Sequence, residues 1–533
     1  MISLRLAFIS LLTVIHVQAS QYGHNYLAVD KDSDIVAKAF QDIEDVSLIA
    51  PAFNSDTVPA EFSNGTSGPT SDQVLDSFIR RLAKKNNWMH YYKADFTSEE
   101  GRPFPYVRLS SSGKKKDKIR VWLQGGVHGN EPAGDQSLLA LLGALNANQT
   151  WTASLLEKLE ILILPRYNPD GVSYFQRTLA SNFDPNRDHV KLARQQTRSI
   201  KALFNKFSPH VAADMHEYTA NRQYGTYKHG SDGLFSAAKN LNIHSGIRNI
   251  SENLFADNIG KAMEARGLRW EPYIESEVDG STVPGYEIIF AEAGSSARIG
   301  RNAMGLTQCV TFLIETRGIR LADQEFQRRT ASALTMVSSI LQTAADNADE
   351  VSSTISASIA DFIDSTDDII LTDSSELTDR LFTMVDVNNG SVVQVPIQFR
   401  PSTPMTANLT RARPESYLIP AGWSDVAQRL QLLGVTVKEL KTPWSGTVEA
   451  LNIVSVAFDS GYYEGSVLAT IATETASKEI NLPEGSFLVS TRQKNAALAM
   501  VALEPENVDS YASVNVIPLE EGDEYPIFRI LGS

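Results

Sequence analysis

Four short apolar runs, each ending in polar residues, constrain the fold of this chain most strongly. The runs are rich in β-branched residues, which favours buried strands at 119–123, 159–164, 211–215 and 310–314. Between and beyond them, apolar residues recur at helical spacing over 137–145, 190–207, 253–266 and 325–343. Strands that alternate with amphipathic helices predict an α/β domain with helices on both faces of a mixed sheet.

This alternation extends from about 76 to 345, and the flanking regions differ from it. Residues 20–75 contain a cluster of Ser, Gly, Pro and Asn and are interpreted as an N-terminal extension or a propeptide. Residues 346–378 are rich in Ser, Thr and Asp, and this composition predicts a linker. Short β-rich runs separated by Gly, Pro and Asn predict a smaller β-rich C-terminal domain over 379–533.

Residues 1–19 have the features of a secretory signal peptide. Arg5 precedes an apolar run from Leu6 to Ile15, and the segment ends on the small residue Ala19. The run is too short to span a bilayer, and no later run is long enough. A buried first helix is the alternative interpretation. Export is also consistent with five N-x-[ST] sequons, which begin at Asn64, Asn148, Asn249, Asn389 and Asn408.

Composition excludes several kinds of partner and chemistry. Acidic residues outnumber basic residues by 63 to 48, which gives a formal charge of −15 and makes nucleic acid a poor partner. Cys309 is the only cysteine, so the chain has neither an internal disulfide nor a cysteine-rich metal site. Because Cys309 lies in an apolar run, we expect it to be a small buried hydrophobic residue.

Polar residues follow each of the four predicted strands. His128 and Glu131 come after the first, Asn168-Pro169-Asp170-Gly171 after the second, His216 after the third and Glu315 after the fourth. Open α/β sheets place their ligand sites at the carboxyl ends of their strands. We therefore expect these residues to meet at one site.

His128, Glu131 and His216 are the candidate ligands of one catalytic zinc ion, which takes three protein ligands and keeps a position for water. His128 and Glu131 are three residues apart on a glycine-flanked turn, so both side chains can reach the same ion. An isolated H-x-x-E is common, and a histidine at a strand end is usually structural. Their coincidence with polar residues at the other strand ends favours a metal site.

Glu315 is the candidate general base. A carboxylate at the end of an apolar strand is expected to be partly desolvated, which raises its pKa toward the working pH. It would activate the zinc-bound water for hydrolysis. The alternative is a simple ion pair with Arg317, because side chains at i and i+2 of a strand share a face.

A loop between the second and third strands carries further candidates. A guanidinium beside an amide suits the recognition of a free carboxylate, and Asn186 and Arg187 form such a pair. Arg177 is placed to stabilise a developing oxyanion. The alternative for all three residues is ordinary charge on a surface loop.

Taken in order along the chain, these elements resemble the zinc metallocarboxypeptidase family of carboxypeptidase A-like peptidases. The family order H-x-x-E, N-P-D-G, R, D-x-N-R, H and E-x-R is matched over about 76–345. The short spacing from Arg177 to Asn186 looks closer to the secreted microbial branch. The resemblance implies a mixed eight-stranded sheet flanked by helices and release of the C-terminal residue from peptides that end in a free carboxylate.

The resemblance also implies a role for each matching residue. His128, Glu131 and His216 correspond to the ligands of one Zn²⁺, and Glu315 to the base that later protonates the leaving amine. The remaining matches are the carboxylate-binding pair Asn186 and Arg187, the carbonyl-polarising Arg177, and Asp184, which orients the first zinc histidine.

Two departures from the family pattern concern substrate binding. The capping tyrosine expected some twenty residues before the catalytic glutamate is replaced by an Ala-, Gly- and Ser-rich stretch, and Tyr286 is the nearest tyrosine upstream. Arg298 and Arg301 lie in the segment expected to set specificity. Either they favour acidic terminal side chains or they are solvated arginines, and we expect the latter.

Two other functions are compatible with the same motifs. An amidohydrolase of the aspartoacylase or succinylglutamate desuccinylase type has similar zinc ligands, base and D-x-N-R element, but N-P-D-G favours the peptidase. A non-catalytic binding protein on the same scaffold would be expected to have lost a ligand or the base, and both are present.

Overall fold

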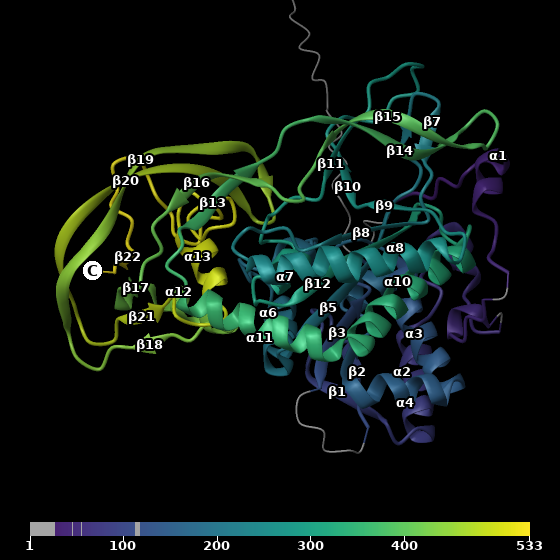
Figure 1. The fold of residues 1–533 in the computed structure, drawn as a ribbon, viewed down its shortest axis with the longest axis horizontal. Coiled ribbons are helices and arrows are strands. Elements are labelled where there is room, and N and C mark those ends of the chain that lie inside the picture. The colour runs from purple at the N-terminus through teal and green to yellow at the C-terminus, as the bar shows by residue number, and fades with distance from the viewer. Residues whose placement is uncertain (1–26, 45, 55, 112–117, 533) are drawn as a thin grey trace, which may run out of the picture.

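A mixed eight-stranded sheet forms the centre of the computed structural model, which describes residues 27–44, 46–54, 56–111 and 118–532 (Figure 1). Its strands, in spatial order, are β1 (Met89–Thr97), β2 (Pro103–Leu109), β4 (Leu159–Leu164), β3 (Ile119–Gly125), β5 (Val211–Thr219), β12 (Val310–Ile319), β8 (Gly233–Ala237) and β9 (Trp270–Pro272). The predicted mixed eight-stranded sheet is therefore confirmed.

The four predicted strands are neighbours in this sheet. β4, β3, β5 and β12 are parallel, so their carboxyl ends meet at one edge. β5 and β12 extend beyond their predicted ends at 215 and 314, which places His216 and Glu315 inside the strands. Register pairs Glu315 with His216 across the two strands, so their side chains lie next to each other on one face.

Helices cover both faces of the sheet, as predicted. On one face the main helices are α2 (Asp72–Lys85), α3 (Pro132–Ala147), α8 (Asp257–Glu264) and α10 (Phe326–Asp346). On the other face, α6 (Gln195–Phe207) packs through Phe204 against Trp122 of β3, with ring centroids 5.4 Å apart. Because side chains alternate along a strand, β3 contributes Val121 and Leu123 to the first face and Trp122 to the second.

A second sheet joins segments that the sequence assigned to different domains. Its strands, in spatial order, are β10 (Ile274–Ser276), β11 (Ile289–Glu292), β15 (Val392–Arg400), β14 (Thr378–Asp386), β7 (Tyr227–His229) and β6 (Gln223–Tyr224). β14 begins at Thr378, next to the expected boundary at 379, and β15 lies beyond it, yet these strands pair with β7 and β11 of the preceding region. Strand pairing therefore continues across the expected boundary, and pairing between distant segments leaves no local sequence signal.

The segment 346–378 is ordered secondary structure and not the expected linker. It contains α11 (Ala348–Asp364) and β13 (Ile369–Ser374), which pairs with β16 (Thr406–Arg411). Val351, Ile355 and Phe362 of α11 are buried. Their spacing is helical, and the many Ser, Thr and Asp residues occupy mainly the remaining faces.

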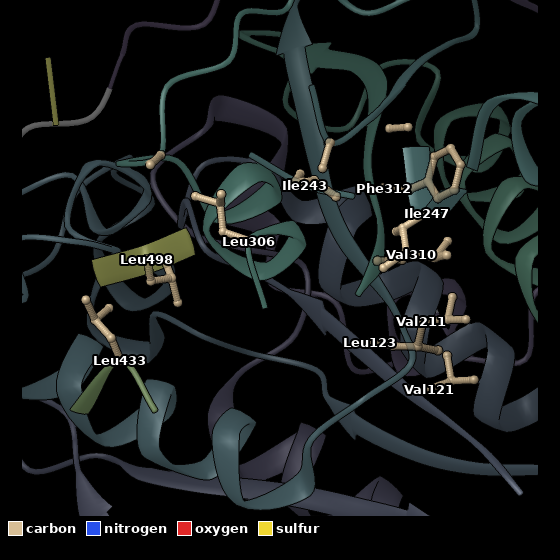
Figure 2. Packing of buried hydrophobic residues seen from close by; sticks show 14 of the residues in the cluster. Val121, Leu123, Val211, Ile243, Ile247, Leu306, Val310, Phe312, Leu433 and Leu498 are labelled. Carbon is tan, nitrogen blue, oxygen red and sulfur yellow. The ribbon is translucent and has the colours of Figure 1, made fainter. Parts of the chain in front are cut away.

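The C-terminal region is rich in strands, as predicted, and packs onto the rest of the chain (Figure 1). Its six-stranded sheet consists of β18 (Lys438–Glu439), β21 (Phe487–Ser490), β17 (Ser416–Ile419), β22 (Phe528–Ile530), β19 (Trp444–Tyr463) and β20 (Ser466–Leu482). Leu433, which follows α12 (Ser424–Leu432), and Leu498 of α13 (Ala496–Leu503) belong to the same buried cluster as Val310 (Figure 2). One core thus extends through both regions.

The described part of the N-terminal extension also packs against the α/β region. Phe62 contacts Phe175 and Phe326, with ring centroids 6.2 and 4.9 Å away. Asp32 is buried and pairs with Arg317 of β12 at 2.5 Å. The predicted signal peptide at 1–19 lies outside the described residues. Within the part of the chain that is described, no helix has the length and apolar character of a membrane span.

Candidate active site

The predicted ligand-bearing turn lies between β3 and α3 and is supported by the N-P-D-G segment. Asn168 caps α5 (Pro169–Tyr174) by accepting the Gly171 N–H at 2.9 Å. A Cβ atom at Gly129 would lie 1.9 Å from the carbonyl carbon of Gly171. Only glycine allows this close backbone approach, so the segment after β4 fixes the turn that carries His128 and Glu131.

His128, Glu131 and His216 converge on one point. Their potential ligand atoms all lie within 4.8 Å of one another, and all three residues are buried. His128 Nδ1 is 2.7 Å from Glu131 Oε1 and 3.1 Å from His216 Nδ1, while His216 Nδ1 is 3.0 Å from Glu131 Oε2. The structure therefore brings together the three predicted ligands from β5 and from the turn after β3.

The other nitrogen of each ring is occupied by a carboxylate. His128 Nε2 lies 3.0 Å from Asp184 Oδ1, and His216 Nε2 lies 3.1 Å from Asp214 Oδ1. When both rings donate from Nε2, the lone pairs of both Nδ1 atoms point toward Glu131, so the three groups can bind one cation between them. Two imidazoles held by carboxylates and one carboxylate ligand fit a zinc ion.

Sequence analysis identified Asp184 but missed Asp214. Asp214 lies two residues before His216 on β5, so the two side chains share a face. It is fully buried, and its Oδ1 also accepts a hydrogen bond from Gln124 Nε2 at 3.0 Å. The signal available in the sequence was an aspartate inside an apolar strand, two residues before a candidate ligand.

The charges of the cluster stabilise one another. Burial favours the neutral ring of His216, but Asp214 and Glu131 outweigh it and raise the pKa of His216 well above its usual value. Burial also favours the protonated form of Glu131, yet His128 and His216 lower the pKa of this carboxyl group. Glu131 is therefore held in its ionised form, in which a carboxylate oxygen can bind a metal ion.

Glu315 faces the same cluster from β12 and has the predicted desolvation. Its side chain lines the cavity that also contains His128 and Glu131. Burial, with a further contribution from the negative charge of Glu131, raises the pKa of Glu315 well above its usual value, although His216 and Arg177 oppose this shift. Its Oε2 has no hydrogen-bond partner among the residues that the structure describes, so this oxygen can accept a proton from a ligand.

The alternative ion pair between Glu315 and Arg317 is not formed. Arg317 Nη1 pairs instead with Asp32 at 2.5 Å and with Glu325 at 3.0 Å. Arg317 thus connects β12 to the N-terminal extension and leaves the carboxylate of Glu315 to the cavity.

Arg177 links the cluster of His128, Glu131 and His216 to the loop that carries Asp184. Its Nη1 lies 3.2 Å from Glu131 Oε1, and its Nη2 lies 2.9 Å from Asp184 Oδ2. The side chain remains about one-third exposed, at 35%, and lines the cavity. The guanidinium is thus held by two carboxylates and is still accessible to a ligand.

Asn186 and Arg187 also line the cavity, as the proposed carboxylate pair requires. The amide oxygen of Asn186 accepts the Gly300 N–H at 2.7 Å, which fixes the orientation of the side chain. Arg187 donates from Nη1 to the Asn186 carbonyl oxygen at 3.0 Å. Three arginines, Arg177, Arg187 and Arg222, therefore line the same cavity of about 270 Å³ as Asn186.

Three tyrosines line this cavity, Tyr218, Tyr224 and Tyr273, and Tyr286 is not one of them. Tyr273 follows β9 and lines the cavity, whereas Tyr286 is not among its lining residues. Burial, and then the negative charge of Glu315, raise the pKa of the Tyr273 hydroxyl group. Tyr273 lies farther before Glu315 than the some twenty residues that the family resemblance implies, so the expected spacing did not point to it.

The expectation that Arg298 and Arg301 are solvated is wrong. Arg298 is buried and pairs with Asp509 of the C-terminal region. Arg301 is only 1% exposed and donates from Nη2 to the Gly294 carbonyl oxygen at 2.6 Å. Neither arginine lines the cavity. Charge alone did not reveal this burial, because the acceptors come from other parts of the fold.

A His–Glu–His cluster at the carboxyl edge of a mixed sheet, with a desolvated glutamate beside it, has the components of a catalytic zinc site. The sequence pattern of the zinc carboxypeptidase family matches residues 75–247. Carboxypeptidase 2 of Trichophyton tonsurans is 58% identical over 521 residues, which cover 96% of each chain. Carboxypeptidase 2 of Trichophyton rubrum is 57% identical over 523 residues, also 96% of each.

The chain therefore belongs to the zinc carboxypeptidase family and is a peptidase. The His128, Glu131 and His216 group is its candidate site for one zinc ion. Among solved structures, a metallo-carboxypeptidase from Burkholderia cenocepacia is similar, with 16% identity and a TM-score of 0.41 over 52% of this chain and 69% of that one.

Proposed function

We propose that this enzyme removes the C-terminal residue of peptides, with His128, Glu131 and His216 as zinc ligands and Glu315 as general base. The observation that carries the proposal is the position of Glu315, which is paired in register with His216 and faces the ligand cluster. Burial raises its pKa, which strengthens the carboxylate as a proton acceptor. The near full-length carboxypeptidase relatives favour a peptidase over the amidohydrolase alternative.

The cationic side of the cavity supports recognition of a peptide's free carboxylate. We assign Arg187 and the amide group of Asn186 to this carboxylate, because charge-assisted bonds from a planar guanidinium fit its two oxygens. Arg177 contacts Glu131 and lines the same cavity as this pair, so we assign it to the carbonyl oxygen of the scissile bond. Asp184 restrains both Arg177 and His128.

In this arrangement the reaction is a hydrolysis that Glu315 assists with proton transfer. A bound zinc ion would supply a water of lowered pKa and polarise the carbonyl group. Glu315 accepts a proton as the water oxygen forms its bond to the carbonyl carbon. Arg177 stabilises the negative charge that develops on the carbonyl oxygen. Glu315 then donates the proton to the leaving nitrogen as the C–N bond breaks, which releases the terminal amino acid.

The variant Glu315→Gln tests this mechanism. We expect kcat to fall by roughly 10²–10⁴-fold, because the amide cannot accept the proton, while zinc content stays near one equivalent. The measurement uses peptides that differ only in their last residue, together with one peptide whose C-terminus is amidated and one N-acyl amino acid.

Glu217→Gln is the matched control. Glu217 is a buried neighbour of His216 whose carboxylate pairs with Arg329, so this variant should lower stability more than it lowers kcat. Full activity of Glu315→Gln would show that another group is the base. Cleavage of the N-acyl amino acid without release of terminal residues from peptides would favour the amidohydrolase.

We also propose that the protein is secreted and glycosylated. The asparagines of all five sequons are exposed: Asn64, Asn148, Asn249, Asn389 and Asn408. This exposure and the signal-like segment at 1–19 support the proposal. N-terminal sequencing of protein recovered from the culture medium, before and after deglycosylation, tests it. An intact Met1 with no change in mass would argue against export.

A further inference from the structure

The tip of the long hairpin β19–β20 reaches the active-site loop from the C-terminal region. Tyr463 pairs with Ser466, so the turn consists of Glu464 and Gly465 alone. Both residues have positive φ angles, 47° and 80°, as in the two-residue turns that match the twist of a hairpin. Glycine is common in such turns, but a glutamate is unusual, because its Cβ approaches the backbone in this region. Residues held in this conformation are often found at functional sites.

This turn forms hydrogen bonds and packing contacts with the loop that carries Asp184 and Arg187. Glu464 Oε2 accepts a hydrogen bond from the Asp184 backbone N–H at 2.8 Å. Lys191 Nζ donates to the Glu464 carbonyl oxygen at 2.9 Å and to Ser466 Oγ at 2.8 Å. Gly465 packs so closely on Phe183 that an added Cβ would lie 2.8 Å from the ring. The hairpin tip therefore contacts the loop on both sides of the residues that line the cavity.

The hydrogen bond to Asp184 is one step away from the ligand cluster. The carboxylate of Asp184 contacts His128 Nε2 at 3.0 Å and Arg177 Nη2 at 2.9 Å, and it accepts the Asn186 backbone N–H at 2.8 Å. These bonds require the backbone at residue 184 to stay in place. Glu464 restrains that backbone, because its carboxylate accepts the hydrogen bond from the backbone N–H of Asp184.

The C-terminal region fixes the opposite side of Asn186 as well. Gly300, which donates to the Asn186 amide oxygen, follows a short segment that is attached to Asp509. Arg298 of this segment pairs with Asp509 and lies over the Tyr463 ring, 5.2 Å from its centroid. The hairpin tip thus contacts the loop directly, and Asp509 supports it through the segment that contains Gly300.

We propose that Glu464 is a positioning residue of the peptidase, through which the C-terminal region holds the Asp184–Arg187 loop in its substrate-binding geometry. This inference depends on the proposed function, because it takes Arg187 and Asn186 as the residues that bind the substrate carboxylate. It assigns to the C-terminal region a role in the reaction, in addition to its contribution to the common core.

Three variants of one side chain test the proposal in the full-length zinc enzyme. Glu464→Ala removes the acceptor, Glu464→Asp keeps the charge but shortens its reach, and Glu464→Gln keeps an acceptor oxygen at the same distance. We expect KM for a peptide substrate to rise roughly tenfold or more in Glu464→Ala and Glu464→Asp, because a small displacement of a binding group weakens its contacts. Glu464→Gln should stay within about threefold of the wild-type KM.

Glu474→Ala is the matched control, since Glu474 is exposed on β20 of the same hairpin. It should leave KM, kcat and the melting temperature unchanged. A wild-type KM in folded Glu464→Ala and Glu464→Asp overturns the proposal. So does a KM for Glu464→Gln that is as high as that of Glu464→Ala. If Glu464→Ala fails to fold, the difference between the Asp and Gln variants decides.

Arg187→Ala separates this proposal from the proposed function. A raised KM in Arg187→Ala together with a wild-type KM in Glu464→Ala rejects the role of Glu464 alone. An unchanged KM in Arg187→Ala shows instead that the assignment of the carboxylate site is wrong.

Discussion

Two aspartates orient the imidazole rings of His128 and His216. Asp184 holds His128 and Asp214 holds His216, each at the nitrogen that faces away from Glu131. Such hydrogen bonds fix the tautomer of a ligating histidine and raise its basicity. Asp184 comes from the loop that leads into the short helix Pro185–Arg187, whereas Asp214 lies on β5, the strand that also carries His216.

We predict that Asp214→Asn weakens zinc binding by about 10- to 100-fold, because the amide is a poorer acceptor for the ring N–H and carries no charge. Competition with a chelator of known affinity measures this effect. Asp232→Asn is the control. Asp232 is a buried carboxylate that pairs with Arg269 and Arg328, away from the cluster, so this variant should lose stability but keep its zinc affinity. An unchanged zinc affinity in Asp214→Asn would contradict the assignment.

Among the elements, the described part of the N-terminal extension packs against the strand that carries Glu315. Asp32 precedes α1 (Asp34–Ala37), and its carboxylate contacts Arg317 at 2.5 Å and Lys228 at 3.0 Å. Its backbone N–H donates to Gln324 at 2.7 Å. The extension thus neutralises a buried cation on the strand that carries Glu315.

The variant Asp32→Asn should lower the free energy of unfolding by roughly 2–4 kcal/mol, because it leaves the buried Arg317 with Glu325 as its remaining carboxylate partner. Urea unfolding measures the change. Asp34→Asn, at an exposed position of α1, should alter stability by less than about 0.5 kcal/mol. Equal stability of Asp32→Asn and the wild type would mean that the extension contributes little through this contact.

At the scale of the whole molecule, the second sheet joins the α/β region to the chain that follows it. His229 lies at this junction, where β7 pairs with β14 through His229 and Met384. Its ring stacks on Phe290, with centroids 5.2 Å apart, and is enclosed by further aromatic rings. Burial, with a contribution from the charge of Arg317, lowers the pKa of His229 to about 3.

This pKa predicts that the folded protein loses stability in acid. The His229 pKa in the folded state lies below the usual value of 6.5, so the unfolded chain takes up the proton first as the pH falls. The stability that His229 contributes to the folded state is therefore fully present above about pH 6.5 and declines toward pH 3. The free energy of unfolding of the metal-free enzyme, measured with urea, should be lower at pH 4 than at pH 7. His229 should account for on the order of 3 kcal/mol of this difference.

His229→Phe keeps an aromatic ring and removes the titration, so it should flatten this part of the pH dependence. His90→Phe is the control, because His90 is exposed on β1. The same pH dependence in His229→Phe and the wild type would assign the acid sensitivity to other groups.

The sequence by itself determined the central sheet and the main components of the site. Continuous apolar runs are a local signal of buried parallel strands, and β3, β4, β5 and β12 followed them. His128, Glu131, His216 and Glu315 were found because they stand at the ends of those runs, and parallel strands bring their carboxyl ends to one edge.

Tertiary structure alone decided what supports these residues. The contact of Glu464 with Asp184 spans 280 positions, and that of Asp32 with Gln324 spans 292. The pairing of β14 with β7 is likewise non-local. A hydrogen bond or an ion pair depends on atoms that meet only after the chain has folded, and no local spacing or composition encodes that meeting. For the same reason, the burial of Arg298 emerged only from the fold.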